Sequence, residues 1–317
     1  MAANWMRRTV MVAACASAAL LAACGSSTTE SAITPQRFIA FGDAMSDVGQ
    51  NGSRYTVNDG SVNNWTLQVV ANYGKTLTPA SAGGTSYATG NARVSAKPDA
   101  AGNASTRTVT EQIDTFLASG SFANTDVVIV SGGVSDVIAG MAAVTAGTQT
   151  EAAMVAAARK AGEDLAAQVR RLVAAGAKYV VVTGTYDLSK SPWAKSIGRE
   201  ALLTDASSRF NDGLLVGIVD LGANVLYVDS AYYVNLYTSV PGNYGFNNAT
   251  TAVCTSVDAT NGIGIGAGKV NSALCNSSTL LSGANQAAYV FADSVYLTPS
   301  AQRQFGTYAY DRLRARW

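Results

Sequence analysis

The chain has 317 residues, a formal net charge of +1 and only 14% charged side chains. With 48% apolar residues, it has the composition of a folded protein, which excludes an intrinsically disordered chain. The near-neutral charge does not support binding of nucleic acid or of an acidic partner. The chain contains no histidine, so a histidine general base is excluded.

The N-terminal segment predicts a secretory signal peptide. Arg7 and Arg8 form a positive region, and an apolar run at 9–20 is too short to span a bilayer. The run closes with Leu-Ala-Ala-Cys at 21–24, which resembles a bacterial lipobox. Residues 1–23 would then be removed and Cys24 lipidated. An ordinary signal peptide with an incidental cysteine is the alternative.

Residues 24–36 are interpreted as the lipidated cysteine and a polar tether without periodicity. Gly25 stands where signals that retain lipoproteins in the inner membrane carry Asp. By that resemblance, the expected location is the cell envelope, as an outer-membrane lipoprotein anchored to the membrane through its lipid.

Beyond the tether, apolar runs alternate with helical patterns. Buried strands are predicted at 38–41, 126–131, 179–183 and 224–229. Helices are predicted at 65–73, 110–117, 151–175, 199–221 and 298–317. This alternation predicts one doubly wound, flavodoxin-like α/β domain over 37–317, with a parallel sheet covered on both faces by helices. The segment 240–288 lacks periodicity and is interpreted as a long excursion.

Ligands of such sheets bind beyond the C-terminal ends of the strands. Gly-containing turns follow three predicted strands, and residues 42–47 read Gly-Asp-Ala-Met-Ser-Asp after the first. Residues 84–92 are Gly-rich, 133–136 read Gly-Val-Ser-Asp, and 293–296 read Asp-Ser-Val-Tyr.

These four blocks resemble, in the same order, those of the GDSL esterases and lipases, also called SGNH hydrolases. The resemblance implies an ester hydrolase with a serine nucleophile at the turn after the first strand. In this chain Ala44 stands at the nucleophile position and Ser135 at the position of an oxyanion-binding Asn. Tyr296 stands at the position of the His base, while Asp293 and Gly90 remain.

The resemblance also assigns Gly90 a backbone N–H in the oxyanion hole and places the first block at the start of a helix. Residues flanking these positions are expected to contact a ligand, namely Asp43, Met45, Ser46, Asn91 and Asp136. Ser46 itself is interpreted as a residue that caps a first helical turn. No cofactor and no metal are expected, because scattered acidic residues at strand ends are more often caps and turn formers.

Cys254 and Cys275 both lie in the Ser/Thr/Asn-rich excursion. In an oxidising compartment they predict a disulfide that pins residues 240–288. The GDSL resemblance supports the same interpretation, because related esterases carry a disulfide loop before the last block.

The replacements predict a GDSL-family lipoprotein that is catalytically impaired and binds an acyl- or acetyl-bearing ligand, a lipid or a glycan. One alternative is an active esterase or lipase that uses Ser46 or an unorthodox base. Tyr296 is a weak candidate for that base, because a free phenol has a pKa of about 10. The other alternative is a structural envelope protein.

Overall fold

The computed structural model describes residues 33–317, so the predictions on residues 1–23 and Cys24 lie outside it. The described chain has one central parallel sheet. Its strands are β1 (Arg37–Phe41), β2 (Asp126–Ser131), β3 (Tyr179–Thr183) and β4 (Val225–Tyr227), in the order β1-β2-β3-β4. On the other side of β1, Ser86 forms an isolated parallel bridge with Ala40. The chain therefore winds in both directions from β1, which confirms the doubly wound fold.

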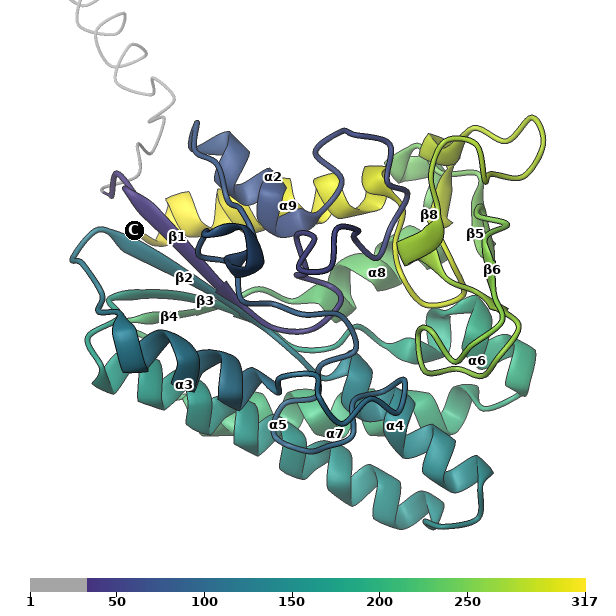
Figure 1. The fold of residues 1–317 in the computed structure, drawn as a ribbon, viewed down its shortest axis with the longest axis horizontal. Coiled ribbons are helices and arrows are strands. Elements are labelled where there is room, and N and C mark those ends of the chain that lie inside the picture. Colours follow the sequence, from purple (N-terminus) through teal and green to yellow (C-terminus); the bar gives the residue numbers. More distant parts are fainter. Residues whose placement is uncertain (1–32) are drawn as a thin grey trace, which may run out of the picture.

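Alternate residues of each strand face opposite layers of helices. Ile39 and Val128 belong to one apolar cluster, and Ala40 and Val127 to the other. The first layer contains α3 (Val109–Ser119), α4 (Val134–Thr145), α5 (Glu151–Ala174) and α7 (Glu200–Ile218). The second contains α2 (Trp65–Asn72) and α9 (Pro299–Arg316). Figure 1 shows these layers below and above the sheet.

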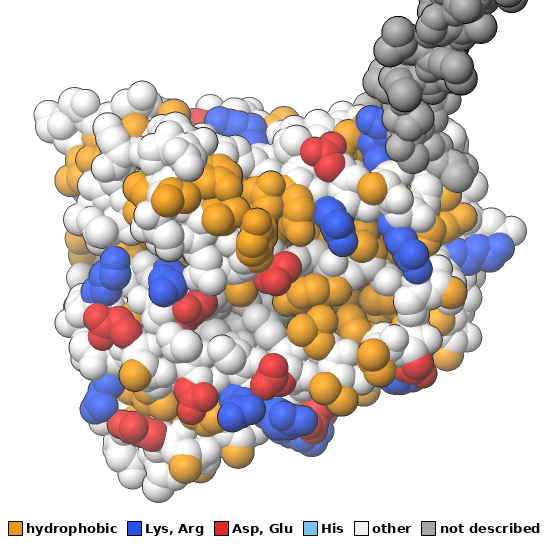
Figure 2. Space-filling view, turned by 180° about the vertical axis from the view of Figure 1, so that it is seen from behind, with side chains coloured by type: hydrophobic (Ala, Val, Ile, Leu, Met, Phe, Trp, Pro, Cys, Tyr) orange, Lys and Arg blue, Asp and Glu red, His pale blue; other side chains and the backbone are white. Residues whose placement is uncertain are grey.

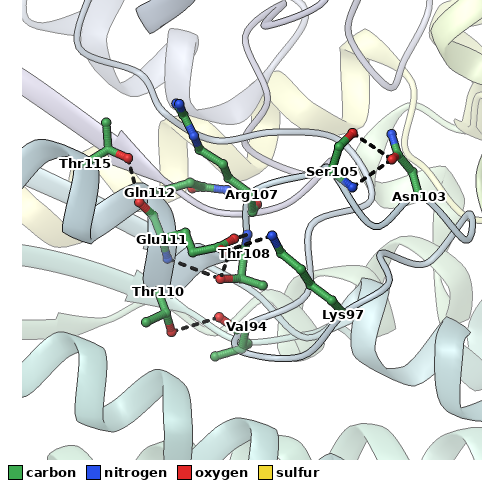
Figure 3. A network of polar contacts seen from close by, with 10 residues as sticks. All are labelled: Val94, Lys97, Asn103, Ser105, Arg107, Thr108, Thr110, Glu111, Gln112 and Thr115. Atoms are coloured by element: carbon green, nitrogen blue, oxygen red, sulfur yellow. Dashed lines mark hydrogen bonds and ion pairs between the residues drawn. The ribbon is translucent and has the colours of Figure 1, made fainter.

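Helix α3 begins at a capping box. The Thr108 hydroxyl accepts a hydrogen bond from the Glu111 N–H, and the Glu111 carboxylate accepts one from the Thr108 N–H (Figure 3). Lys97 adds an ion pair to Glu111 at 2.8 Å. Because these contacts satisfy N–H groups that have no partner within the helix, they fix where α3 starts. The start of α3 in turn places Gln112, whose contact with the first motif is described below.

Three helices were not predicted from the sequence: α4, α6 (Pro192–Ile197) and α8 (Ser230–Ser239). α4 starts directly after the Gly-rich turn at 132–133, whose composition indicated a loop. α6 has only six residues, too few to show a helical period. The last predicted strand is shorter than expected, because Asp229 caps α8 through a hydrogen bond from the Tyr232 N–H at 2.9 Å.

The excursion at 240–288 contains short strands where none were predicted. β5 (Asn248–Ala252) pairs in parallel with β8 (Tyr289–Phe291), and β6 (Val257–Asp258) pairs antiparallel with β7 (Lys269–Val270). Runs as short as these leave no periodic signal in the sequence.

Cys254 and Cys275 form the predicted disulfide, with Cα atoms 5.9 Å apart. Their side chains lie in a small buried cluster with Val57, Val253 and Ala292. Between residues 33 and 317, no helix combines the length and apolar character needed to cross a membrane.

Candidate functional site

The first motif forms a tight turn at the end of β1. Gly42 has a φ of +155° and lies so close to Ser131 that a Cβ would clash with its side chain. The Gly42 N–H donates to Gln112 Oε1 at 2.8 Å, and Gln112 Nε2 donates to the Gly42 carbonyl at 2.9 Å. Gln112 of α3 thus fixes the turn by binding both backbone polar groups of Gly42. Residues 44–46 form a turn, which corrects the expectation that a helix starts there.

Ala44 is the residue at the nucleophile position, and it is buried, with 1% of its surface exposed. A methyl side chain offers no lone pair or proton, so this position cannot form an acyl intermediate. Its neighbour Met45 is also buried, and its N–H donates to Asp43 Oδ1 at 3.1 Å. The backbone of the family turn is thus retained without its reactive group.

Ser46 is fully buried beneath the turn and has no capping role. Its Oγ accepts a hydrogen bond from Trp65 Nε1 at 3.1 Å and one from the Ser131 hydroxyl at 2.7 Å. These contacts join the turn to α2 and β2. The interpretation as a cap is corrected, because a side chain directed into the core cannot reach the N–H groups of its own turn.

The backbone N–H of Gly90, expected in the oxyanion hole, is already engaged. It donates to Asp47 Oδ2 at 2.8 Å, while Asp47 Oδ1 accepts the N–H groups of Gly49 and Gln50, each at 2.8 Å. One carboxylate therefore organises two loops. An N–H committed to a carboxylate cannot stabilise a developing oxyanion.

Tyr55 covers Gly90 and contacts the His position. A Cβ at Gly90 would clash with the Tyr55 hydroxyl, so glycine is required here by close approach. The Tyr55 ring packs edge-on against Tyr296, with centroids 5.3 Å apart. Tyr55 therefore closes the space between the second and fourth motifs.

Ser135 and Asp136 lie in the first turn of α4 and are both buried. The Ser135 hydroxyl forms no hydrogen bond with any described residue. Asp136 accepts the Val94 N–H at 3.1 Å and pairs with Arg93 at 3.4 Å. Burial raises the pKa of Asp136 to about 6, although the charge of Arg93 opposes that rise.

The Asp293 carboxylate binds backbone N–H groups of and near the fourth motif and does not orient a general base. Its Oδ1 accepts the N–H groups of Val295 and Tyr296 at 2.7 Å each, and its Oδ2 accepts the Ser272 N–H at 3.0 Å. The Tyr296 side chain is fully buried, and burial, followed by the charge of Asp43, raises the pKa of its phenol well above the ordinary value. A phenol with so high a pKa stays protonated and cannot act as a general base near neutral pH.

Unpaired polar atoms gather around these positions. Asp43 Oδ2, Asn91 Oδ1, Ser135 Oγ and Tyr296 Oη are all buried without a hydrogen-bond partner among residues 33–317. Burial raises the pKa of Asp43 to about 7. The N–H of Met45 opposes this rise, and the charge of Asp136 adds to it. An ionised Asp43 would thus be costly, since no described cation pairs with it.

The loop at 259–268, between β6 and β7, packs against the Gly-rich motif. Asn91, which has a φ of +62°, donates from Nδ2 to the Gly262 carbonyl at 2.8 Å. Asn261 donates to the Ala101 carbonyl at 3.3 Å, and Ile263 is 2% exposed in the same apolar cluster as Ala44. The disulfide-pinned excursion therefore covers the region in which the family carries out its chemistry.

A groove opens on the outer side of this loop. It has a volume of about 370 Å³. Its lining comes from α4, α6 and the loop, and the large side chains in it are Met141, Trp193, Ile197 and Ile265. The groove is predominantly apolar, which is the usual character of a pocket for an acyl chain.

The sequence did not indicate several residues that shape the site. Tyr55, Gln112, Arg93 and Ile263 act through contacts with residues distant in the chain, and each has an ordinary local context. The acidic residues at strand ends behave as expected for turn formers: Asp187 accepts the Ser189 N–H at 3.1 Å and pairs with Lys190. No group of three or more potential metal ligands occurs between residues 33 and 317.

Comparison with known protein families shows which family the chain belongs to. The family model described as GDSL-like Lipase/Acylhydrolase matches residues 38–308. The chain belongs to this GDSL family. Its parallel α/β sheet is consistent with the fold of the family, so the predicted resemblance and fold class are confirmed.

Two solved crystal structures are similar to this GDSL-family chain. They share 15% and 12% sequence identity, with TM-scores of 0.45 and 0.44. Each comparison covers 89% of this chain and 98% of the other. Similarities at this level say nothing about activity. No match was found among curated proteins.

Proposed function

We propose that this GDSL-family protein is catalytically impaired, is held at the cell envelope by a lipid on Cys24, and binds an acyl- or acetyl-bearing ligand. The observation that carries the impairment is the set of replacements Ala44, Ser135 and Tyr296 in a chain without histidine. All three side chains are at most 1% exposed. Loss of a whole triad elsewhere costs about 10⁶ in rate.

An active esterase that uses Ser46 is not favoured. Ser46 Oγ accepts two hydrogen bonds inside the core and has no exposed surface. A nucleophile must reach a substrate carbonyl and pass its proton to a nearby base. Neither requirement is met, since the residues around Ser46 are Trp65 and Ser131.

The apolar groove supports the ligand part of the proposal. Its volume of about 370 Å³ falls within the usual range for small-molecule pockets. Hydrocarbon contact with Met141, Trp193, Ile197 and Ile265 would favour an acyl chain over a free sugar. The structural-protein alternative predicts no such binding.

Ester hydrolysis tests the impairment. The purified protein is expected to hydrolyse p-nitrophenyl acetate and butyrate no faster than about a thousandfold over background. Combining Ala44→Ser, Ser135→Asn and Tyr296→His should raise the rate, whereas Ala44→Ser alone should do little, because a serine without a base stays protonated. Robust turnover by the unmodified chain that disappears in Ser46→Ala would overturn the proposal.

Fatty-acid titration tests the ligand. Octanoate and decanoate should raise the melting temperature of the wild type and change the fluorescence of Trp193. Ala142→Trp, which fills the groove, should abolish both effects. An equal response in wild type and Ala142→Trp, or no response in either, would favour the structural-protein alternative.

A further inference from the structure

The described chain begins and ends at the same end of the sheet. The Ile33 N–H donates to the Trp317 carbonyl at 3.3 Å, and the Trp317 ring packs on Tyr179 with centroids 5.1 Å apart. Figure 1 shows the start of β1 and the C-terminus at the end of the molecule opposite to β5 and β8. Ile33, where the described chain begins, therefore lies at the edge farthest from the candidate site.

Large aliphatic side chains are exposed near this edge. Val219 is 79% exposed and Val216 is 65% exposed, the two highest values among the large hydrophobic residues described. Leu215, beside them at the end of α7, is 40% exposed. Aliphatic side chains gathered at one helix end are a feature of surfaces that meet an apolar phase.

Two cationic residues, Lys178 and Arg316, lie near the end of α7. Arg316 donates to the Gly222 carbonyl just after α7, and Asn224 donates to the Lys178 carbonyl at 3.2 Å, so α9, β3 and the end of α7 meet there. Figure 2 shows hydrophobic side chains interspersed with Lys and Arg on the part of this face nearest the grey segment.

The charge of this edge is unbalanced. The acidic residues Asp114, Asp126 and Asp220 are already neutralised by ion pairs with Arg171, Arg37 and Arg170. By contrast, Lys75, Lys178, Arg312 and Arg316 form no ion pair with any residue from 33 to 317. Asp311, one position before Arg312, faces the Tyr233 and Tyr308 side of α9 instead. The edge thus carries net positive charge.

We infer that the exit surface, formed by Lys178, Val216, Val219, Arg312, Arg316 and Trp317, docks on a bilayer that contains anionic phospholipid. Lys and Arg bind the anionic headgroups, while the valine side chains enter the interfacial region. The candidate site and the groove then face away from the bilayer. Charge complementarity and the exit point of the chain both favour a membrane over a protein partner.

The inference goes beyond the proposed function and does not require the lipid on Cys24. If that lipid is present, the eight residues between Cys24 and Ile33 reach at most about 30 Å. The tether would then keep the exit surface near the membrane and raise its effective concentration there. Even weak docking would then give a substantial fraction of docked protein.

Vesicle co-sedimentation tests the inference. The chain from Ser26 onward contains every described element and lacks the lipidation site. It should pellet with vesicles of phosphatidylglycerol and phosphatidylethanolamine, less so as salt rises, and not with phosphatidylcholine vesicles. Lys178→Glu with Arg316→Glu should weaken binding at least about tenfold, and Val216→Asp with Val219→Asp should also weaken it.

A matched control changes the same residue types at the far end. Val257, which is 60% exposed on β6, and its neighbour Lys269 on β7 lie in the excursion. Val257→Asp with Lys269→Glu should leave vesicle binding unchanged, and circular dichroism with thermal melting should show that every variant is folded. Equal pelleting with neutral vesicles, exit-surface variants that bind like wild type, or an equal loss in the control would each overturn the inference. None of these outcomes depends on ester hydrolysis or on Cys24 labelling.

Discussion

Single side chains support the proposal that the family's site is catalytically impaired in this chain. Asp47 takes the Gly90 N–H, Tyr55 closes over Gly90, and Tyr296 fills the His position with a buried phenol. Tyr296 stands where the family has its histidine, and Asp47 and Tyr55 bind and cover Gly90. The cost is a set of buried polar atoms without partners, of which Asp43 Oδ2 carries the largest electrostatic consequence.

Replacing Asp43 should change how stability depends on pH. Burial raises the pKa of Asp43 to about 7, above the value of about 3.9 in an unfolded chain. Asp43 therefore keeps its proton to higher pH in the folded state than in the unfolded state. The stability that this protonation contributes is complete below pH ~4 and is lost as pH rises through ~7. Asp43→Asn should remove this loss and be more stable than wild type at pH 8, by on the order of 3 kcal/mol.

Urea unfolding of both proteins between pH 5 and pH 8 would measure this difference. Asp136, whose pKa is raised in the same direction to about 6, stays in both proteins. Because its charge acts on Asp43, the measured difference includes this coupling. Parallel stability curves for the two proteins would show that Asp43 is ionised in the folded state.

Ser46→Ala should cost stability rather than activity. The change leaves Trp65 Nε1–H and the Ser131 hydroxyl without their buried acceptor, which should lower the free energy of unfolding by about 2 kcal/mol. Ser81→Ala is the matched control, since the Ser81 hydroxyl bonds to the Gln50 carbonyl at the surface. It should shift stability by less than about 0.5 kcal/mol. Chemical denaturation measures both, and an unchanged midpoint for Ser46→Ala would contradict the assigned contacts.

At the scale of elements, the excursion between α8 and β8 decides access to the site. The disulfide between Cys254 and Cys275 crosslinks the excursion internally. Asn58 ties it to the domain, since its N–H and Nδ2 donate to the Cys275 carbonyl at 2.9 and 3.1 Å. The loop at 259–268 then reaches back to Asn91. A segment with few regular elements thus gains its fixed position from the pairing of β5 with β8, from scattered backbone and side-chain hydrogen bonds and from the internal crosslink.

Removing the disulfide should loosen this excursion without melting the sheet. Cys254→Ala with Cys275→Ala should lower the free energy of unfolding by about 3 kcal/mol, because the crosslink no longer restricts the unfolded chain. Hydrogen exchange should accelerate at 254–275, while β1–β3 keep their protection. Reductant added to wild type should reproduce the effect and add two protons to the intact mass. Two free thiols in the untreated protein would exclude the bond.

At the scale of the whole molecule, the two ends of the sheet have different surroundings. The C-terminal edge carries the four motifs and the excursion, and the opposite edge carries the chain exit and unpaired cations. With the proposed lipid on Cys24, this polarity would order the molecule as anchor, exit surface, sheet and covered site. It follows from the parallel sheet, since parallel strands place all their C-terminal ends at one edge.

The proposed anchor is tested by labelling Cys24. Cells that express the full chain and are fed a clickable fatty acid should yield labelled protein, because residues 21–24 resemble a lipobox and follow two arginines. Cys24→Ser should abolish the label, and Cys15→Ser should leave it unchanged. Equal labelling of wild type and Cys24→Ser would show that the leader is an ordinary signal peptide.

The sequence by itself determined the sheet, its main helices, the disulfide and the identity of the replaced residues. These signals are local, because a buried strand or a short motif is defined by neighbours within a few positions. The sequence did not reveal α8 or the short strands of the excursion. It also did not reveal that the Gly90 N–H donates to the Asp47 carboxylate. The contact between Gly90 and Asp47 joins residues 43 positions apart, and Asn91 meets Gly262 across 171 positions. Such partners depend on how the layers pack, and only the tertiary structure decides that.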